Sequence, residues 1–264
     1  MEQAATLAKL KVQCEQTGNE LADAEAMLRE RHTDTTLGSS TAKMRALHRL
    51  ELRLETLRRR QESQVGRLKV LEEVAQVKEM MREAAECGDV ERLSELIKVG
   101  LPINAPDGIG FTPLLYACGS GRVEAARLLL DSGSDCNYGA GTVTGLGLAS
   151  KRGALDVVKL MLQRGARVAA TDETGKTALH LACMGGHAEI AQELLDAKAG
   201  IHASDNKGDT PLHIACSHKL TSLARLLVDW GATITHRNGA GYTPIDVALM
   251  VKSAELVSIL RGDK

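Results

Sequence analysis

The chain is poor in aromatic side chains: its 264 residues include one Trp, three Tyr and one Phe. Hydrophobic residues still make up 44% of the sequence, which is enough to form a core. That core must be aliphatic and rich in alanine. Such a composition suits thin layers of closely packed helices better than a deep globular interior.

The sequence also lacks a long apolar run and a strong net charge. No apolar stretch of about 18 residues occurs, and Met1–Ala5 resembles no secretory leader, so we expect neither a membrane span nor export. The net charge of −1 gives no overall field that would attract nucleic acid or a membrane. We therefore expect a cytoplasmic protein, with the cytoskeleton, the cilium and the nucleus left open.

The six cysteines form no Cys-x-x-Cys pair, which disfavours a zinc site. Cys118, Cys183 and Cys216 each follow the Ala of a repeated motif, so we interpret them as small buried apolar side chains. Reduced thiols in a reducing compartment fit this pattern best. No metal or cofactor is expected.

Five six-residue stretches share one pattern, which begins with Thr and ends with Ala. Their Thr residues are 32, 33, 33 and 33 positions apart. The stretches are Thr112–Ala117, Thr144–Ala149, Thr177–Ala182, Thr210–Ala215 and Thr243–Ala248. A period near 33 indicates a stack of repeated structural units.

Each repeat has the chemistry of a helix pair. Thr can cap the first helix, and a following Pro can occupy its first position. Four residues after the Ala comes a turn glycine, and a second helix with a Leu-rich stripe then ends at another glycine. The turn glycines are Gly88, Gly121, Gly153 and Gly186, and the second set is Gly100, Gly133, Gly165 and Gly231.

The Thr-Pro-Leu-His-x-Ala pattern at this period resembles the ankyrin repeat family. The resemblance implies an all-α solenoid and, with the register extended backwards to Ala84 and Gly88, six repeats over residues 79–264. The first and last repeats diverge from the pattern. Residues 1–78 would then form a separate arm.

Departures from the pattern mark unusual places in the stack. The third repeat has lost a loop residue and carries Gly145 and Gly147 inside its first helix, which predicts either a soft joint or neutral drift. Lys198 replaces a capping glycine, and Lys219 and Lys252 replace turn glycines. We expect strained backbone at these three lysines.

The arm contains two heptad stripes separated by a polar break at residues 32–40. Because the stripes alone do not choose a partner, an α-helical hairpin and a dimeric coiled coil are both open. The first stripe comprises Leu7, Leu10, Cys14, Thr17, Leu21, Ala24 and Leu28. The second comprises Leu47, Leu50, Leu54, Leu57, Gln61, Gln64, Leu68, Leu71 and Ala75.

The second arm helix is basic, with Arg58, Arg59 and Arg60 as its densest part. One interpretation is a solvated face partly neutralised by the acidic first helix. The other is docking on an acidic surface of a large assembly. Nucleic-acid binding through residues 43–69 is a weaker alternative, because no aromatic side chains interleave with the arginines.

No motif in the chain predicts catalysis. Gly175-Lys176-Thr177 resembles the end of a phosphate-binding loop, but Ala170 stands where that loop needs glycine. His180 and His213 occupy equivalent repeat positions, where the resemblance implies hydrogen bonds to loop backbone. We therefore expect a non-enzyme.

In the ankyrin family the concave face, formed by loop tips and first helices, binds protein partners. Carried over in register, this implies a scaffold or adaptor, with a structural component of a cytoskeletal or axonemal assembly as the alternative. The implied partner-binding residues are Phe111, Lys151, Arg152, Lys176, Met184, His218 and Tyr242.

Overall fold

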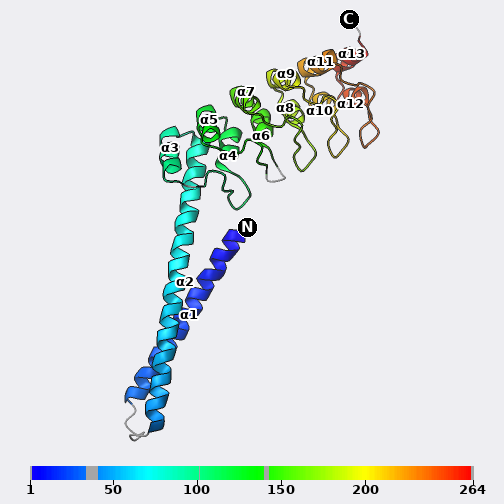
Figure 1. The fold of residues 1–264 in the computed structure, drawn as a ribbon. Coiled ribbons are helices and arrows are strands. Elements are labelled where there is room, and N and C mark those ends of the chain that lie inside the picture. The colour runs from blue at the N-terminus through cyan, green and yellow to red at the C-terminus, as the bar shows by residue number, and fades with distance from the viewer. Residues whose placement is uncertain (1, 34–40, 101, 140–142, 263–264) are drawn as a thin grey trace. The chain divides into compact units, whose positions relative to one another are not determined.

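The computed structural model describes residues 2–33, 41–100, 102–139 and 143–262 (Figure 1). Across these ranges the chain forms thirteen helices, and its only β contact is an isolated bridge between Thr171 and Thr177. The all-α fold expected from the sequence is therefore confirmed. By internal contacts the chain divides into two compact units, Met1–Glu79 and Met80–Lys264.

The first unit is built from α1 (Glu2–Thr33) and the greater part of α2 (Thr41–Cys87). Two ion pairs show that the helices run antiparallel. Arg58 lies 2.7 Å from Glu25, and Lys11 lies 2.9 Å from Glu72, so early residues of α1 meet late residues of α2. The two heptad stripes thus pair within one chain, as a hairpin.

Burial follows the predicted stripes over most of the hairpin. Leu10, Thr17 and Ala24 of α1 are buried, as are Leu54 and Leu57 of α2. The second stripe is exposed from Leu71 onwards, which the pattern did not predict. Residues 34–40 of the predicted polar break and the side chain of Leu47 lie outside the described residues.

The second unit is a stack of helix pairs in two rows (Figure 1). First helices of successive repeats contact one another, and so do second helices. The first helices are α4 (Pro113–Gly119), α6 (Gly145–Arg152), α8 (Ala178–Gly185), α10 (Pro211–Ser217) and α12 (Pro244–Met250). The second helices are α3 (Val90–Lys98), α5 (Val123–Asp131), α7 (Leu155–Gln163), α9 (Ala188–Asp196), α11 (Thr221–Asp229) and α13 (Ala254–Arg261).

One aliphatic core runs through the stack. The end of α2 contributes Met81, Ala84 and Ala85 to it, which completes the divergent first repeat. Leucines such as Leu129 and Leu194 are fully buried, and each such side chain contributes about 2 kcal/mol of hydrophobic stabilisation. Cys118, Cys183 and Cys216 are also fully buried, so the interpretation of these cysteines as core residues is confirmed.

Local geometry also agrees with the repeat chemistry. Thr residues precede every first helix from α4 to α12, and Pro begins α4, α10 and α12. The turn glycines have positive φ, and so do Lys198, Lys219 and Lys252, at 63°, 58° and 56°. The strained backbone predicted at these lysines is confirmed.

The glycines of the third repeat have a packing role. A Cβ atom added to Gly147 would lie 2.9 Å from Leu181 Cδ1 and from Thr144 Oγ1, and one on Gly145 would lie 3.0 Å from Met161 Cε. Helices α6 and α8 also make the most extensive contact of any helix pair in the described chain. This close approach favours tight packing over the soft-joint interpretation.

Candidate protein-interaction surface

Four finger loops, residues 107–111, 172–176, 205–209 and 238–242, each begin with an Asp or Asn that closes the loop. Asp172 Oδ1 accepts hydrogen bonds from the backbone N–H groups of Thr174 and Lys176, both at 2.9 Å. Asp107, Asp205 and Asn238 accept the equivalent pairs. Such local bonds fix the shape of a loop, so the residue at its end has a fixed position.

Contacts between fingers join the last three loops. The side-chain amide of Asn206 donates to the carbonyl oxygen of Glu173 at 2.9 Å. The amide of Asn238 donates to Asp209 Oδ1 at 2.7 Å. Lys176 lies 3.0 Å from Asp205, whose side chain is almost completely buried. These fingers therefore act as one connected surface.

Two buried histidines tie the first helices to these fingers. The backbone N–H of Thr210 donates to Nδ1 of His213, so Nε2 carries the hydrogen and donates to the carbonyl oxygen of Tyr242 at 3.0 Å. His180 makes the same contacts with Thr177 and with the carbonyl oxygen of Asp209. Both imidazoles are structural, as the resemblance implied.

Burial is the largest influence on both histidines and lowers the pKa of each below its ordinary value of 6.5. Carbonyl and carboxylate neighbours oppose this shift. Near His180 these are the Asp209 carbonyl and Asp205, and near His213 the Tyr242 carbonyl and Asp209. Lys176 and His236 reinforce the lowering at His180 and His213 respectively. The folded protein thus favours neutral imidazoles.

We expect the free energy of unfolding to fall as the pH drops below about 6.5, because the unfolded chain then binds protons that the folded chain resists. The loss should level off below the lowered folded pKa of His180 and His213. Urea unfolding between about pH 7.5 and about pH 5.5 measures this slope. His180→Gln should make the slope shallower, and an unchanged slope would contradict the assignment.

A separate cluster surrounds the finger of the second repeat. Tyr116 donates its hydroxyl hydrogen to Asp107 Oδ2 at 2.6 Å, Phe111 packs against its ring, and Arg82 lies over the ring face. Burial, followed by the bond to Asp107, raises the pKa of Tyr116 to about 12. Burial acts to raise the pKa of Asp107 as well, but hydrogen bonds from Tyr116 and the loop backbone outweigh it and lower that pKa.

The predicted partner-binding residues divide into two groups. Lys151, Arg152, His218 and Tyr242 are exposed. The remainder, Phe111, Lys176 and Met184, are half-buried, and the first two make the internal contacts described above. The ammonium group of Lys176 is committed to Asp205, so this residue is not one of the proposed partner contacts.

Two apolar residues that are not among the seven predicted partner-binding residues are also exposed. Ile109, at the tip of a finger, is 69% exposed, and Leu249, near the end of α12, is 52% exposed. Leu249 occupies the register position at which Cys118, Cys183 and Cys216 are buried by the next repeat. Its exposure follows from its place in the last described repeat, so the repeat register could have revealed it.

The arginine run of the arm is partly neutralised. Arg58 pairs with Glu25 of α1, and Arg59 lies 2.6 Å from Glu55 one turn earlier on α2. Arg60 makes no ion pair within the described residues. The solvated and partly neutralised face considered from the sequence is therefore present.

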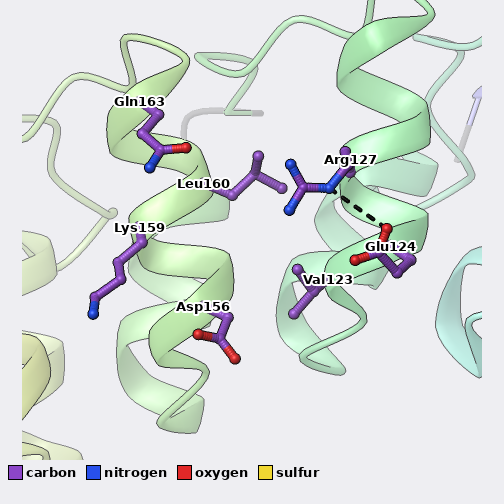
Figure 2. Close-up of a pocket in the computed structure, with 7 residues that line it drawn as sticks. All are labelled: Val123, Glu124, Arg127, Asp156, Lys159, Leu160 and Gln163. Carbon is purple, nitrogen blue, oxygen red and sulfur yellow. Dashed lines mark ion pairs between the residues drawn. The ribbon is translucent and has the colours of Figure 1, made fainter.

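A cleft of about 460 Å³ lies between α5 and α7, where sequence patterns predicted nothing (Figure 2). Four charged side chains line it, and Glu124 and Arg127 form an ion pair of 3.5 Å across one turn of α5. Val123 and Leu160 supply the apolar part of its lining. With acids and bases balanced, the cleft has no preference for a charged ligand.

The described residues contain no group of three His, Cys, Asp or Glu side chains placed to hold a metal ion. Neither the two long helices nor any repeat helix in these ranges has the length and apolar character that a membrane span requires.

Comparison with known families identifies the repeats. The chain matches the family model described as ankyrin repeats (3 copies) over residues 72–140 and 146–238. The gap falls at the shortened loop of the third repeat. The match ends before α12 and α13, which the structure shows to be a further helix pair of the stack.

Similar curated proteins share only the repeats. The chain is 40% identical over 92 residues to "E3 ubiquitin-protein ligase hecd-1" of Caenorhabditis elegans, which covers 34% of the chain and 3% of that protein. It is 35% identical over 105 residues to "Ankyrin repeat, SAM and basic leucine zipper domain-containing protein 1" of Colobus guereza, covering 38% and 22%. For "Putative E3 ubiquitin-protein ligase XBAT34" of Arabidopsis thaliana the identity is 36% over 105 residues, covering 38% and 28%.

The chain spans less than a third of the length of each of these relatives, so their other domains have no counterpart in the similarity. The family match, by contrast, covers more than half of the chain and coincides with the stacked helix pairs. Ankyrin repeats are protein–protein interaction modules, and this chain belongs to the ankyrin repeat family.

Proposed function

We propose that the protein is a non-catalytic scaffold that binds one protein on its first-helix face and a second partner through the arm. The first-helix face is defined as the finger loops and the exposed residues of α4, α6, α8, α10 and α12. The observation that carries the proposal is that this face presents exposed apolar side chains on first helices and on finger loops whose shape is fixed by internal hydrogen bonds. Ile109, Tyr242 and Met250 are 69%, 44% and 62% exposed.

Protein interfaces draw most of their affinity from a few aromatic, Arg and large apolar side chains held in place. Tyr242 satisfies this description, because its backbone is held by Asn238 and His213 while its ring is exposed. For the arm, Arg59 and Arg60 offer positive charge suited to an acidic protein surface, such as that of a cytoskeletal assembly. The proposal includes self-association of the arm through the exposed end of the second stripe, Leu71 and Ala75.

The six free cysteines fit a reducing compartment, which supports a cytoplasmic or nuclear location for the proposed scaffold. The ligase relatives named above owe their names to whole proteins of which this chain matches a small part. Ligase activity is not part of the proposal.

Two full-length variants test the bridging function. Ile109→Ala with Tyr242→Ala should remove one set of captured proteins, and Arg59→Gln with Arg60→Gln should remove another. Loss of a hot-spot side chain costs about 2 kcal/mol, or roughly 30-fold in affinity. Quantitative affinity capture measures both sets, and unfolding midpoints close to that of the unmodified protein confirm that each variant is folded.

Loss of the same proteins from both variants would show one shared surface and overturn the bridging proposal. Unchanged capture by both variants would overturn the assigned contact residues. If the arm bound only nucleic acid, with an affinity that falls steeply as the salt concentration rises, the result would instead support nucleic-acid binding through residues 43–69.

A further inference from the structure

All three non-glycine residues with positive φ in the described chain are lysines: Lys198, Lys219 and Lys252. Left-handed backbone costs a residue with a Cβ atom about 1 kcal/mol, and glycine avoids that cost. Other repeats place glycine at the same positions, for example Gly186 with φ 76°. Strained residues that persist in this way often mark functional sites.

Two of these lysines share one register position. Lys219 follows the end of α10 and Lys252 follows the end of α12, where Gly153 and Gly186 follow α6 and α8. Because α10 and α12 are neighbours in the stack, the two ammonium groups lie on the same edge of the unit. Lys198 is elsewhere, beyond the end of a second helix, α9.

The same edge continues to the third repeat. Lys151 and Arg152 end α6, and α8 ends directly beside them. A Cβ atom added to Gly185 would lie 2.8 Å from the carbonyl oxygen of Lys151, and Nε2 of His187 lies 3.2 Å from that oxygen. We call this edge the turn ridge. It consists of Lys151, Arg152, His218, Lys219, Met250 and Lys252, all of which are exposed.

The ridge carries positive charge without carboxylate partners. The only carboxylate in the first helices and turns of repeats three to six is Asp246, which accepts hydrogen bonds from the N–H and hydroxyl of Thr243. Asp156, Glu189 and Glu255 lie in the first turns of the next helices, but no ion pair joins them to the ridge within the described residues. Five cationic or titratable side chains thus line one edge unopposed.

Helix stability explains only part of this pattern. Basic residues in the last turn of a helix, such as Lys151 and Arg152 in α6, interact favourably with the helix dipole. The helix dipole does not explain Lys219 and Lys252, because these residues lie beyond the helix ends. At both sites glycine would relieve the backbone strain. Recognition of a negatively charged ligand accounts for both observations.

We propose that the turn ridge binds an acidic polypeptide segment in which Glu or Asp residues alternate with apolar ones. Acidic side chains would contact the lysines, and an apolar side chain would cover Met250, which is 62% exposed. Nucleic acid fits less well, because the ridge holds no Phe, Tyr or Trp for base stacking and the chain has a net charge of −1. The inference rests on the proposed scaffold function and names the chemistry of one partner.

The test is binding of a short fluorescent peptide of alternating Glu and Leu residues to the full-length protein, measured by anisotropy at low and physiological salt. Lys219→Gly with Lys252→Gly should weaken binding about five-fold, as expected for two exposed charge contacts. The same variant should be at least as stable as the unmodified protein, because glycine relieves the strain. Loss of folding therefore cannot explain weaker binding.

Lys198→Gly is the matched control, since it relieves the same strain away from the ridge and should leave peptide affinity unchanged. Equal affinity of the double variant and the unmodified protein would overturn the inference. So would equal binding of a peptide with Gln in place of Glu, or tighter lysine-dependent binding of duplex DNA or phosphatidylserine vesicles. None of these results alters the capture pattern of the Tyr242 variant, so the scaffold proposal is judged separately.

Discussion

Replacement of His213 by alanine is expected to lower the free energy of unfolding by about 3 kcal/mol. The side chain is only 1% exposed, so its removal leaves a cavity. It also accepts a hydrogen bond from the Thr210 N–H and donates one to the Tyr242 carbonyl oxygen. Both of these backbone groups lose their hydrogen bond to the imidazole in the variant. Urea unfolding of the variant and the unmodified protein measures the difference.

His218→Ala is the control for this experiment, because His218 is exposed on the next turn of the same repeat. Exposed positions of this kind usually change stability by less than about 0.5 kcal/mol. A loss of equal size in both variants would refute the bridging role of His213. The finger that carries Tyr242 should also exchange its amide hydrogens faster in the His213 variant, since the hydrogen bond to the Tyr242 carbonyl oxygen is gone.

Replacement of Gly147 by histidine is expected to destabilise the stack by about 2 kcal/mol, although it restores the repeat pattern. His180 and His213 hold this register position in the following repeats. At residue 147, however, a Cβ atom would already lie 2.9 Å from Leu181 and Thr144, so an imidazole ring must displace its neighbours. Thermal and urea unfolding report the loss.

Gly66→Ala supplies the matched control, because Gly66 also lies inside a helix but a Cβ atom there would contact nothing within 4 Å. That change should stabilise the arm helix by up to about 1 kcal/mol. Leu181→Ala should cost less stability in the Gly147 variant than in the unmodified protein, since it removes the methyl group that the new side chain contacts. If Gly147→His alone stabilised the protein, α6 would have space for a larger side chain at residue 147. That result would favour the soft-joint interpretation of the third repeat.

The repeat pattern predicted the fold well because the same few positions do the same work in every unit. Thr capping, turn glycine and the Ala that lets helices approach are local requirements, so Thr210, Gly121 and Ala117 could be interpreted without coordinates. The hairpin was one of two open alternatives. The sequence could not choose it because the contacts that define it, such as Arg58 with Glu25, join residues far apart in the chain.

The binding surface was less predictable for a physical reason. The repeat register shows which residues lie at the end of a finger. It does not show which of their side chains already make contacts within the protein. Lys176 is committed to a buried Asp205, and Phe111 to Tyr116, while Tyr242 at the same finger position is exposed. The cleft between α5 and α7 arises from side chains at unrelated pattern positions, so no motif pointed to it.

The reactivity of the buried cysteines depends on how often each repeat opens. Burial raises the pKa of Cys118 and Cys216 to about 12 and that of Cys183 further still, so none forms a reactive thiolate while its repeat stays closed. Each thiol sits in a different repeat, the second, fourth and fifth. Oxidative damage would therefore fall first on whichever of these repeats opens most often, which makes local breathing of the solenoid a determinant of its chemical lifetime.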